Sequence, residues 1–291
     1  MLLPKQPTST RPAWPREALL LGGLYLAYEL GRLLSRDELG EALANSRHLE
    51  SVERALHLDP EHFLNGALSG HTALAVVAAY FYSTLHYVVT PIVLVWMYRR
   101  RPDHYRFART TLAVGTLLAL AGFSLMPTAP PRLLPASGLT DTLAQVQAWG
   151  WWGGDGSVPR GMGGLSNQFA AMPSLHVGWA MWSGLLVARF ATHRAVRWLG
   201  ATYPLLTTVV VLSTGNHYLL DAFAGAATIG VGAAAAVLIL RLSPRQARAR
   251  EIALPTPRRA AAPEGYDGYD GSDAYDGYDG SDAYAVGSAT R

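Results

Sequence analysis

The sequence has no cysteine among its 291 residues. This absence excludes disulfide bonds, thiolate metal sites and cysteine nucleophiles. Charged residues are also scarce, at 15% of the chain, where about 25% is usual for a soluble domain. Hydrophobic residues make up 50% of the chain. This balance favours a membrane protein over a soluble one.

Lysine is nearly absent, because Lys5 is the single lysine and every other basic side chain is an arginine. The isoelectric point of 9.2 alone would suit a nucleic-acid-binding protein. The arginines, however, stand at the ends of apolar stretches, which is the distribution that membrane topology produces. We therefore expect a membrane environment and no nucleic-acid partner.

Apolar stretches of membrane-spanning length recur along the chain. A spanning helix needs about 20 mostly apolar residues. The stretches that meet this need are Ala18–Leu34, Thr72–Tyr98, Phe107–Met126, Ser174–Phe190, Val196–Ser213 and Tyr218–Leu242. The first is not followed by a small-residue cleavage site, so we expect it to be retained. The sequence thus predicts an all-α fold, a polytopic membrane helix bundle with six transmembrane helices.

Basic residues predict how this bundle is oriented. They form four clusters, one before the first stretch and one after each of the second, fourth and sixth. In that order the clusters are Lys5, Arg11, Arg16; Arg99, Arg100, Arg101, Arg106, Arg109; Arg189, Arg194, Arg197; and Arg241, Arg245, Arg248, Arg250. All clusters fall on one side of a bundle with six spans, and that side should be cytoplasmic. We expect a multi-pass protein of the cell membrane with both termini cytoplasmic and residues 35–70 and 127–173 outside.

Composition divides the chain into three parts. Residues 1–17 are predicted to be a cytoplasmic N-terminal segment, and residues 18–250 the membrane domain. From residue 251 to 291, Gly, Asp and Tyr are abundant, and the nine-residue sequence of Tyr266–Ala274 recurs at Tyr275–Ala283. No apolar face can form there, so we expect a disordered cytoplasmic tail.

The two outer segments have different character. The first should hold a short amphipathic helix in the headgroup layer, with Glu50 and Glu53 off an apolar face formed by Leu49, Val52, Leu56 and Leu58. The second is long and rich in Gly, Pro and Trp, which is typical of a functional loop. It could be a lid or a substrate-facing wall, or a plain interfacial loop with Trp149, Trp151 and Trp152 at the membrane surface.

A first polar motif, Pro173-Ser174-Leu175-His176, opens the fourth stretch. Pro173 suits the first turn of a helix, whose free N–H groups can bind an anion. Ser174 adds a hydroxyl, and His176 can supply a proton beside a bound phosphate. Taken alone, a histidine near the end of a span is more often an interfacial residue.

A second polar motif, Asn216-His217-Tyr218-Leu219-Leu220-Asp221, opens the sixth stretch. His217 and Asp221 are four residues apart and therefore share one helix face. The carboxylate can fix the tautomer of the imidazole, which leaves the other ring nitrogen as a nucleophile or base. A capping arrangement at the helix start is the alternative.

A third polar feature is Arg132 in the proline-rich loop after the third stretch. Its planar guanidinium matches phosphate oxygens, although a plain headgroup anchor would also use an arginine here. The topology places all three motifs on the outer side of the membrane. Together they favour a phosphate-handling site.

The two histidine motifs resemble those of the type 2 phosphatidic acid phosphatase superfamily, and most closely its inositol phosphorylceramide synthase branch. The resemblance rests on Pro173-Ser174-Leu175-His176, on His217-x-x-x-Asp221 and on the proline-rich loop before them, and it covers about residues 98–242. It implies that His217 attacks phosphorus, that Asp221 orients it and that His176 protonates the leaving oxygen.

The sequence departs from the pattern of the phosphatase branch, and these departures favour the transferase-like branch. Leu175 replaces the glycine of that branch, and Val211 stands where it has an arginine six residues before the second histidine. Phosphate binding should therefore depend on Arg132, on the first turn of the fourth stretch, and on Ser213, Thr214 or Asn216. The expected substrate-binding residues are Arg132, Ser174, Asn216 and Tyr218.

The sequence thus predicts a membrane lipid phosphotransferase that acts on a lipid phosphate ester through a phosphohistidine. A lipid phosphate phosphatase that uses water is the alternative, and a non-catalytic lipid-binding membrane protein is the alternative of another class. Because histidine supplies the nucleophile, neither a metal ion nor an organic cofactor is expected.

Overall fold

The fold is given by a computed structural model, which describes residues 12–34, 39–135, 137–153 and 168–242. The chain divides into two units, residues 1–249 and 250–291. The predicted disordered tail lies outside the described residues, as do residues 1–11 of the predicted N-terminal segment.

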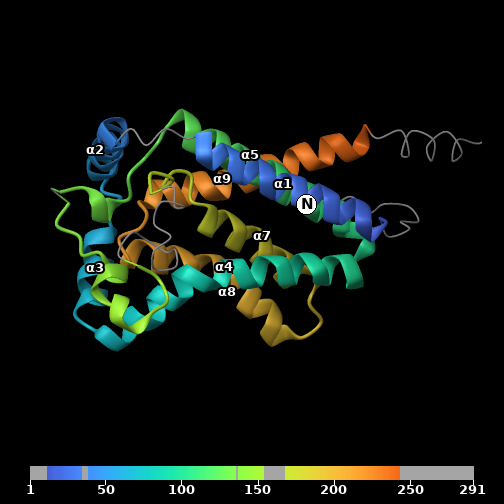
Figure 1. The fold of residues 1–291 in the computed structure, drawn as a ribbon. Helices are drawn as coiled ribbons and strands as arrows, with labels where there is room; N and C mark the ends of the chain where they lie inside the picture. Colours follow the sequence, from blue (N-terminus) through green and yellow to red (C-terminus); the bar gives the residue numbers. More distant parts are fainter. Residues whose placement is uncertain (1–11, 35–38, 136, 154–167, 243–291) are drawn as a thin grey trace, which may run out of the picture. The chain divides into compact units, whose positions relative to one another are not determined.

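All regular elements of the described ranges are helices (Figure 1). The longer helices are α1 (Trp14–Leu34), α4 (Thr72–Arg100), α5 (Pro102–Leu125), α7 (Leu175–Phe190), α8 (Arg194–Ser213) and α9 (Leu219–Arg241), and they match the predicted apolar stretches. The shorter ones are α2 (Leu39–Leu56), α3 (Glu61–Ser69), α6 (Thr142–Gln145) and the 3₁₀ turns η1 (Pro131–Leu133) and η2 (Gln147–Trp149). The predicted all-α class is confirmed.

Four of the helices are long and apolar enough to cross a membrane, namely α4, α5, α8 and α9. By contrast, α7 has 16 residues, fewer than the roughly 20 that a span usually needs. The structure therefore supports a membrane protein with several spanning helices.

The end of α4 and the start of α5 carry residues that are favourable at helix termini. Helix α5 begins with Pro102 in its first turn and Asp103 beside it, where a missing N–H and a negative charge are both favourable. Helix α4 ends on Arg99 and Arg100, whose positive charges suit the carboxyl end of a helix dipole. These residues place the turn between α4 and α5 directly after the apolar part of α4.

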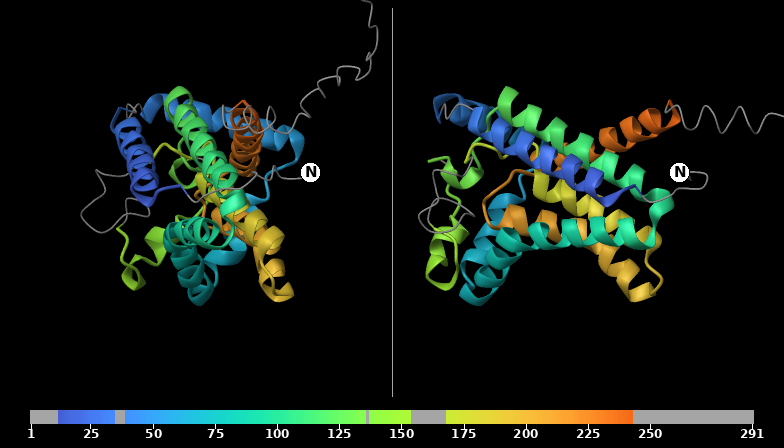
Figure 2. Two further views of the ribbon diagram at one scale, coloured as in Figure 1. Left: turned by 90° about the vertical axis from the view of Figure 1, so that its right-hand side faces the viewer. Right: turned by 45° about the vertical axis from the view of Figure 1, so that its right-hand side comes forward.

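The long helices pack around α7. Helix α5 lies along α9, while α7 contacts α4, α8 and α9 (Figures 1 and 2). Large side chains fill the space between them, and Trp182 of α7 donates its indole N–H to the carbonyl of Ala108 at 2.8 Å. The starts of α7 and α9 are thereby held beside the middle of α4.

The connecting segments divide between the two ends of this bundle. Helices α2 and α3 and the loop that contains α6 lie together at one end, at the left of Figure 1. The arginine-rich turns lie at the other, where Arg101 donates to the carbonyl of Phe190 at 2.7 Å. The predicted outer segments thus share one end of the bundle, and the basic clusters of the described helices share the opposite end.

The first outer segment forms α2, and its buried face includes acidic side chains, which the sequence did not indicate; its place in the headgroup layer stays a prediction. In α2, Glu53 is 1% exposed and Glu50 is 8% exposed, whereas Leu56 is 56% exposed. Glu53 faces the protein because it accepts the main-chain N–H of Leu220 in α9, whereas Glu50 pairs with Arg54 of its own helix. One face of the helix is therefore buried in the protein, and it combines apolar and polar residues, namely Ala42, Ser46, Leu49, Glu50 and Glu53.

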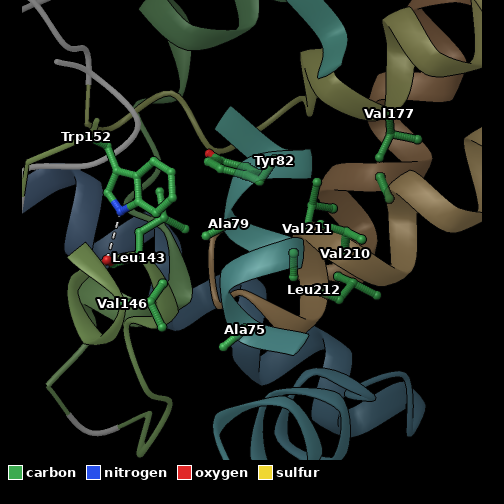
Figure 3. Close-up of a cluster of buried hydrophobic side chains, with 12 residues drawn as sticks. Ala75, Ala79, Tyr82, Leu143, Val146, Trp152, Val177, Val210, Val211 and Leu212 are labelled. Carbon is green, nitrogen blue, oxygen red and sulfur yellow. Dashed lines mark hydrogen bonds between the residues drawn. The ribbon is translucent and has the colours of Figure 1, made fainter. Parts of the chain in front are cut away.

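Trp152 belongs to a cluster of buried hydrophobic side chains (Figure 3) and is therefore not an interfacial residue. Its ring is fully buried against α4, next to Tyr80, and its indole N–H donates to the carbonyl of Leu143 at 2.9 Å. Trp149 is 67% exposed, which fits the predicted interfacial position. This part of the second outer segment is thus a wall packed on α4, and residues 154–167 lie outside the described ranges.

Candidate active site

His217 lies in the tight turn between α8 and α9. Gly215 has a φ of +71° there, a backbone conformation that glycine adopts without strain. The imidazole Nδ1 of His217 is 2.9 Å from the carbonyl oxygen of Ala171 and 3.3 Å from Oδ2 of Asp221. His217 is 3% exposed and Asp221 is fully buried.

These two contacts define the protonation of the imidazole. A main-chain carbonyl oxygen only accepts hydrogen bonds, so Nδ1 of His217 must carry the hydrogen. Nε2 then keeps its lone pair, and it has no hydrogen-bond partner among the described residues. Asp221 is held in turn, because its Oδ2 accepts the main-chain N–H of Tyr218 at 2.8 Å. The arrangement matches a nucleophilic histidine with a fixed tautomer.

His176 stands in the first turn of α7 and faces His217. Their ring centroids are 5.5 Å apart with an angle of 62° between the planes. Tyr82 of α4 stacks on His176 at 4.3 Å and so fixes the plane of its ring. Nε2 of His176 is inaccessible and has no partner in the described part of the chain. Two unpaired imidazole nitrogens thus occur at one site.

The start of α7 differs from the sequence prediction. Pro173 precedes the helix, and Ser174 is the N-cap, whose Oγ accepts the N–H of Val177 at 3.4 Å. A capping serine satisfies helix amides that would otherwise be open. Its hydroxyl hydrogen remains able to donate to an anion.

Helices α7 and α9 approach each other closely beside the histidines. The N–H of Ser174 donates to the carbonyl of Asp221 at 2.9 Å. A Cβ atom at Gly225 would collide with the main chain of Ser174. Small residues let membrane helices approach each other closely, and Gly225 does so at the point where His176 and His217 are brought together.

Arg132 lies against the turn that carries His217. Its Nε donates to Oδ1 of Asn216 at 2.9 Å, and one terminal nitrogen donates to Asp141 at 2.8 Å. Its main-chain N–H also donates to the carbonyl of Gly215 at 3.0 Å. Arg132 and Asn216 thus belong to one network beside the site. The partner carboxylate, Asp141, was not anticipated from the sequence.

Tyr218 points away from the two histidines. Its ring is 3% exposed and faces α2, where Ser46 and Glu50 are its neighbours. Its main-chain N–H is the group that binds Asp221. A contribution of the phenol to substrate binding stays a prediction.

Two buried carboxylates at the start of α9 were missed by sequence reasoning. Glu61 accepts the N–H of Leu219 and Glu53 that of Leu220, both at 2.6 Å. Together with Asp221, these glutamates accept hydrogen bonds from three consecutive main-chain N–H groups, those of Tyr218, Leu219 and Leu220. The only signal in the sequence is the acidic character of the first outer segment, which does not indicate which acids are buried.

Burial changes the acidity of these carboxyl groups. Removal from water raises the pKa of Glu53 to about 8, although the N–H of Leu220 opposes the shift and the nearby charges of Glu61 and Asp221 add to it. Burial also raises the pKa of Glu61. At neutral pH Glu53 is therefore protonated and accepts through its carbonyl oxygen. The start of α9 carries less negative charge than its composition indicates.

Histidine and carboxylate side chains are also common metal ligands. Within the described ranges, no group of three or more His, Asp or Glu side chains has an arrangement that could hold a metal ion. The polar groups at the site are those of His176, His217, Asp221 and the network of Arg132.

Comparison with known proteins places this arrangement in a family. A family model described as the PAP2 superfamily matches residues 47–235. No curated protein and no solved structure matches the chain. Members of the superfamily are generally phosphatases or phosphotransferases of phosphate esters. The matched region contains both histidine motifs, Arg132 and the two capping glutamates, and the chain belongs to the PAP2 superfamily.

Proposed function

We propose that this protein is a lipid phosphotransferase of the cell membrane that works through a phosphohistidine at His217. The proposal includes the finer sequence predictions: six transmembrane helices, both termini in the cytoplasm and the site on the outer side. The observation that carries it is the contact of Nδ1 of His217 with both Ala171 and Asp221. This contact leaves Nε2 as a lone pair beside His176.

In the first step, Nε2 of His217 attacks the phosphorus of a lipid phosphate ester. The N–P bond forms as the P–O bond to the leaving group breaks. His176, as an imidazolium, gives its Nε2 proton to the leaving oxygen, so that an alcohol departs. The bound phosphate is negatively charged and stabilises that imidazolium. Asp221 balances the positive charge that develops on His217.

In the second step, a hydroxyl group takes the phosphoryl group. The neutral His176 accepts the hydroxyl proton, the oxygen attacks phosphorus and the N–P bond breaks. His217 returns to its starting form with the hydrogen on Nδ1, and His176 is again an imidazolium. With a lipid alcohol as acceptor the reaction is a transfer, and with water it is a hydrolysis.

Positive and polar groups supply the phosphate-binding part of the site. Arg132 retains donors beyond those used for Asn216 and Asp141, because a guanidinium carries five N–H groups. The first turn of α7 adds the Ser174 hydroxyl and the positive end of a helix dipole. Such prepositioned donors stabilise the charge of the transferring phosphoryl group.

Two observations favour transfer over hydrolysis. His217 is 3% exposed, so bulk water has little access to the proposed N–P bond. The Pro173-Ser174-Leu175-His176 motif also resembles that of the inositol phosphorylceramide synthase branch more than that of the phosphatase branch. Phosphatidylinositol is therefore the first donor to test, with a ceramide as acceptor.

The test compares wild type with His217→Ala in detergent micelles. Each is given phosphatidylinositol or a lipid phosphate monoester, with and without an acceptor lipid. We expect turnover that depends on His217 and increases with acceptor. Release of inorganic phosphate from the monoester at the same rate without acceptor would show a phosphatase. Equal turnover by His217→Ala would contradict the assignment of the nucleophile, and a functional His217→Ala protein in cells would point to a non-catalytic lipid-binding role.

A further inference from the structure

A third histidine adjoins the proposed catalytic pair and has no part in the mechanism above. His86 lies in the middle of α4 and is 7% exposed. Its ring centroid is 4.2 Å from that of His176. Nδ1 of His86 is buried and has no hydrogen-bond partner among the residues described. A buried polar atom without a partner is unfavourable by about 1–3 kcal/mol, so its presence here requires a reason.

The main-chain carbonyl of Tyr82, one turn earlier on α4, interacts with the His86 imidazole, but it forms no hydrogen bond of good geometry with Nδ1, and neither does any other group of the described residues. Trp179, whose ring is 6.1 Å from that of His86, already donates its indole N–H to Thr116 at 3.0 Å. The ring of Tyr87 lies 3.9 Å from the imidazole and covers a face of it. Leucine or phenylalanine would fill the same space without an unpaired atom. The unpaired Nδ1 of His86 therefore favours a hydrogen-bond partner that belongs to a bound ligand.

The depth of His86 indicates which part of a ligand it meets. Tyr82 contacts both His176 and His217, and His86 follows it by one helical turn, toward the middle of α4. Trp179 likewise follows His176 along α7. His86 thus lies on the membrane-core side of the two proposed catalytic histidines, about one turn below them.

A lipid phosphate ester has its polar groups in a fixed order along the membrane normal. The phosphate lies at the level of the headgroups, and the hydrocarbon chains occupy the membrane core. Between them, one or two carbon atoms from the ester oxygen, comes a hydroxyl, amide or ester group of the lipid backbone. If phosphorus lies between His176 and His217, that backbone group comes to the level of His86.

We propose that Nδ1 of His86 forms a hydrogen bond with the first polar group of the lipid backbone and so selects lipids that carry one. This inference rests on the proposed function, because it takes phosphorus to lie at His217. His86 is then a specificity-determining residue: it contacts the substrate next to the reacting phosphate but takes no part in the chemical step.

The experiment compares donors that differ only below the phosphate. Hexadecyl phosphate has no polar backbone group, lysophosphatidate has an ester and a hydroxyl, and ceramide 1-phosphate has an amide and a hydroxyl. The kcat/KM of each is measured for wild type, His86→Phe and His86→Gln. Phenylalanine keeps the ring contact and removes both nitrogens, and glutamine keeps a hydrogen-bonding group. His104→Phe, at the tilted ring pair with Phe190 at the other end of the bundle, is the control.

Wild type should have a higher kcat/KM for lysophosphatidate, ceramide 1-phosphate or both, which carry a polar backbone group, than for hexadecyl phosphate. His86→Phe should lower kcat/KM for the preferred lipid by about 5–150-fold, the loss expected for an unpaired buried group, and for hexadecyl phosphate less than about 2-fold. His86→Gln should recover part of the loss, and the control should change neither value. An equal loss on all three donors would overturn the inference, because it would show that His86 acts through His176.

Binding separates this inference from the proposed function. The same lipids are titrated into His217→Ala and into His217→Ala/His86→Phe, with the intrinsic tryptophan fluorescence as readout. Selective weakening of the backbone-bearing lipids in the double variant supports the role of His86 even if wild type turns over no donor, in which case only the proposed function fails. Identical affinities in the two variants contradict the role of His86.

Discussion

The imidazole of His217 shares its Nδ1 hydrogen between the main-chain carbonyl of Ala171, at 2.9 Å, and the carboxylate of Asp221, at 3.3 Å. A catalytic triad usually assigns this orienting contact to a carboxylate alone. Here the shorter contact is made by the main chain just before α7. The position of that segment therefore determines the tautomer of the histidine as much as Asp221 does.

The first prediction concerns Asp221→Asn. In a serine protease triad the equivalent change lowers kcat by about 10⁴-fold, because the wrong tautomer becomes stable. The carbonyl of Ala171 continues to require the hydrogen on Nδ1, so we expect a smaller loss, on the order of 10²-fold. Steady-state kinetics with a lipid phosphate measures it, with Asp103→Asn at the far end of α5 as control. An unchanged kcat would show that Asp221 is only a helix cap.

The second prediction concerns the arginine network. Arg132→Lys keeps a positive charge but cannot bind Asn216, Asp141 and a phosphate together, because an ammonium group lacks the planar fork. We expect KM for the lipid phosphate to rise about 10-fold or more, with a smaller change in kcat. Arg54→Lys, at an exposed side chain that pairs with Glu50, should alter neither value. A lower kcat at constant KM would show that Arg132 positions the His217 turn and does not bind substrate.

The third prediction concerns pH. A carboxyl group whose pKa is raised in the folded protein contributes stability that is complete below its unfolded pKa and lost as pH rises through the folded value. For Glu53 the loss falls between pH 4.5 and about 8. Above this range an ionised Glu53 stands beside Glu61 and Asp221. Unfolding of wild type should therefore occur at lower temperature at pH 9 than at pH 6.

Glu53→Gln tests this assignment, because glutamine resembles the protonated acid and still accepts the N–H of Leu220. The variant should lose less stability between pH 6 and pH 9 than wild type, by roughly 2–4 °C in Tm. Glu50→Gln on the same helix is the control and should follow wild type. If both variants follow wild type, Glu53 does not change its protonation in that range.

The fourth prediction concerns the contact between α7 and α9. Gly225→Ala places a methyl group against the main chain of Ser174, whereas Gly230→Ala meets nothing within 4 Å on the same helix. Overpacking of this kind destabilises by about 1–3 kcal/mol. We expect Gly225→Ala to reduce both stability and turnover, since it separates His176 from His217. Gly230→Ala should change neither, and equal effects would indicate a general intolerance of α9 to alanine.

The long helices could be predicted from the sequence because each apolar stretch encodes its own helix. Thr72–Tyr98 became α4, and Tyr218–Leu242 became α9, with boundaries within two residues. His217 and Asp221 could be paired for the same reason, since a spacing of four residues defines one helix face.

The remaining parts of the site depend on contacts between distant segments. Glu53 and Leu220 are 167 residues apart, and no periodicity within α2 indicates that the acidic face is the buried one. The carbonyl of Ala171 carries no side-chain signal at all. No pattern in the sequence connects His86 with His176, and only the packing of α4 on α7 brings their ring centroids to 4.2 Å.

The most direct test of the account is to trap the proposed phosphoenzyme. Purified protein is mixed with p-nitrophenyl phosphate carrying labelled phosphate and is then quenched in alkali, in which a phosphohistidine survives. This leaving group needs no proton, so His176→Ala should form the intermediate but lack the base for the second step. We predict label on Nε2 of His217 in wild type, more label in His176→Ala and none in His217→Ala. Label that persists in His217→Ala, or turnover by wild type without labelled His217, would contradict the account.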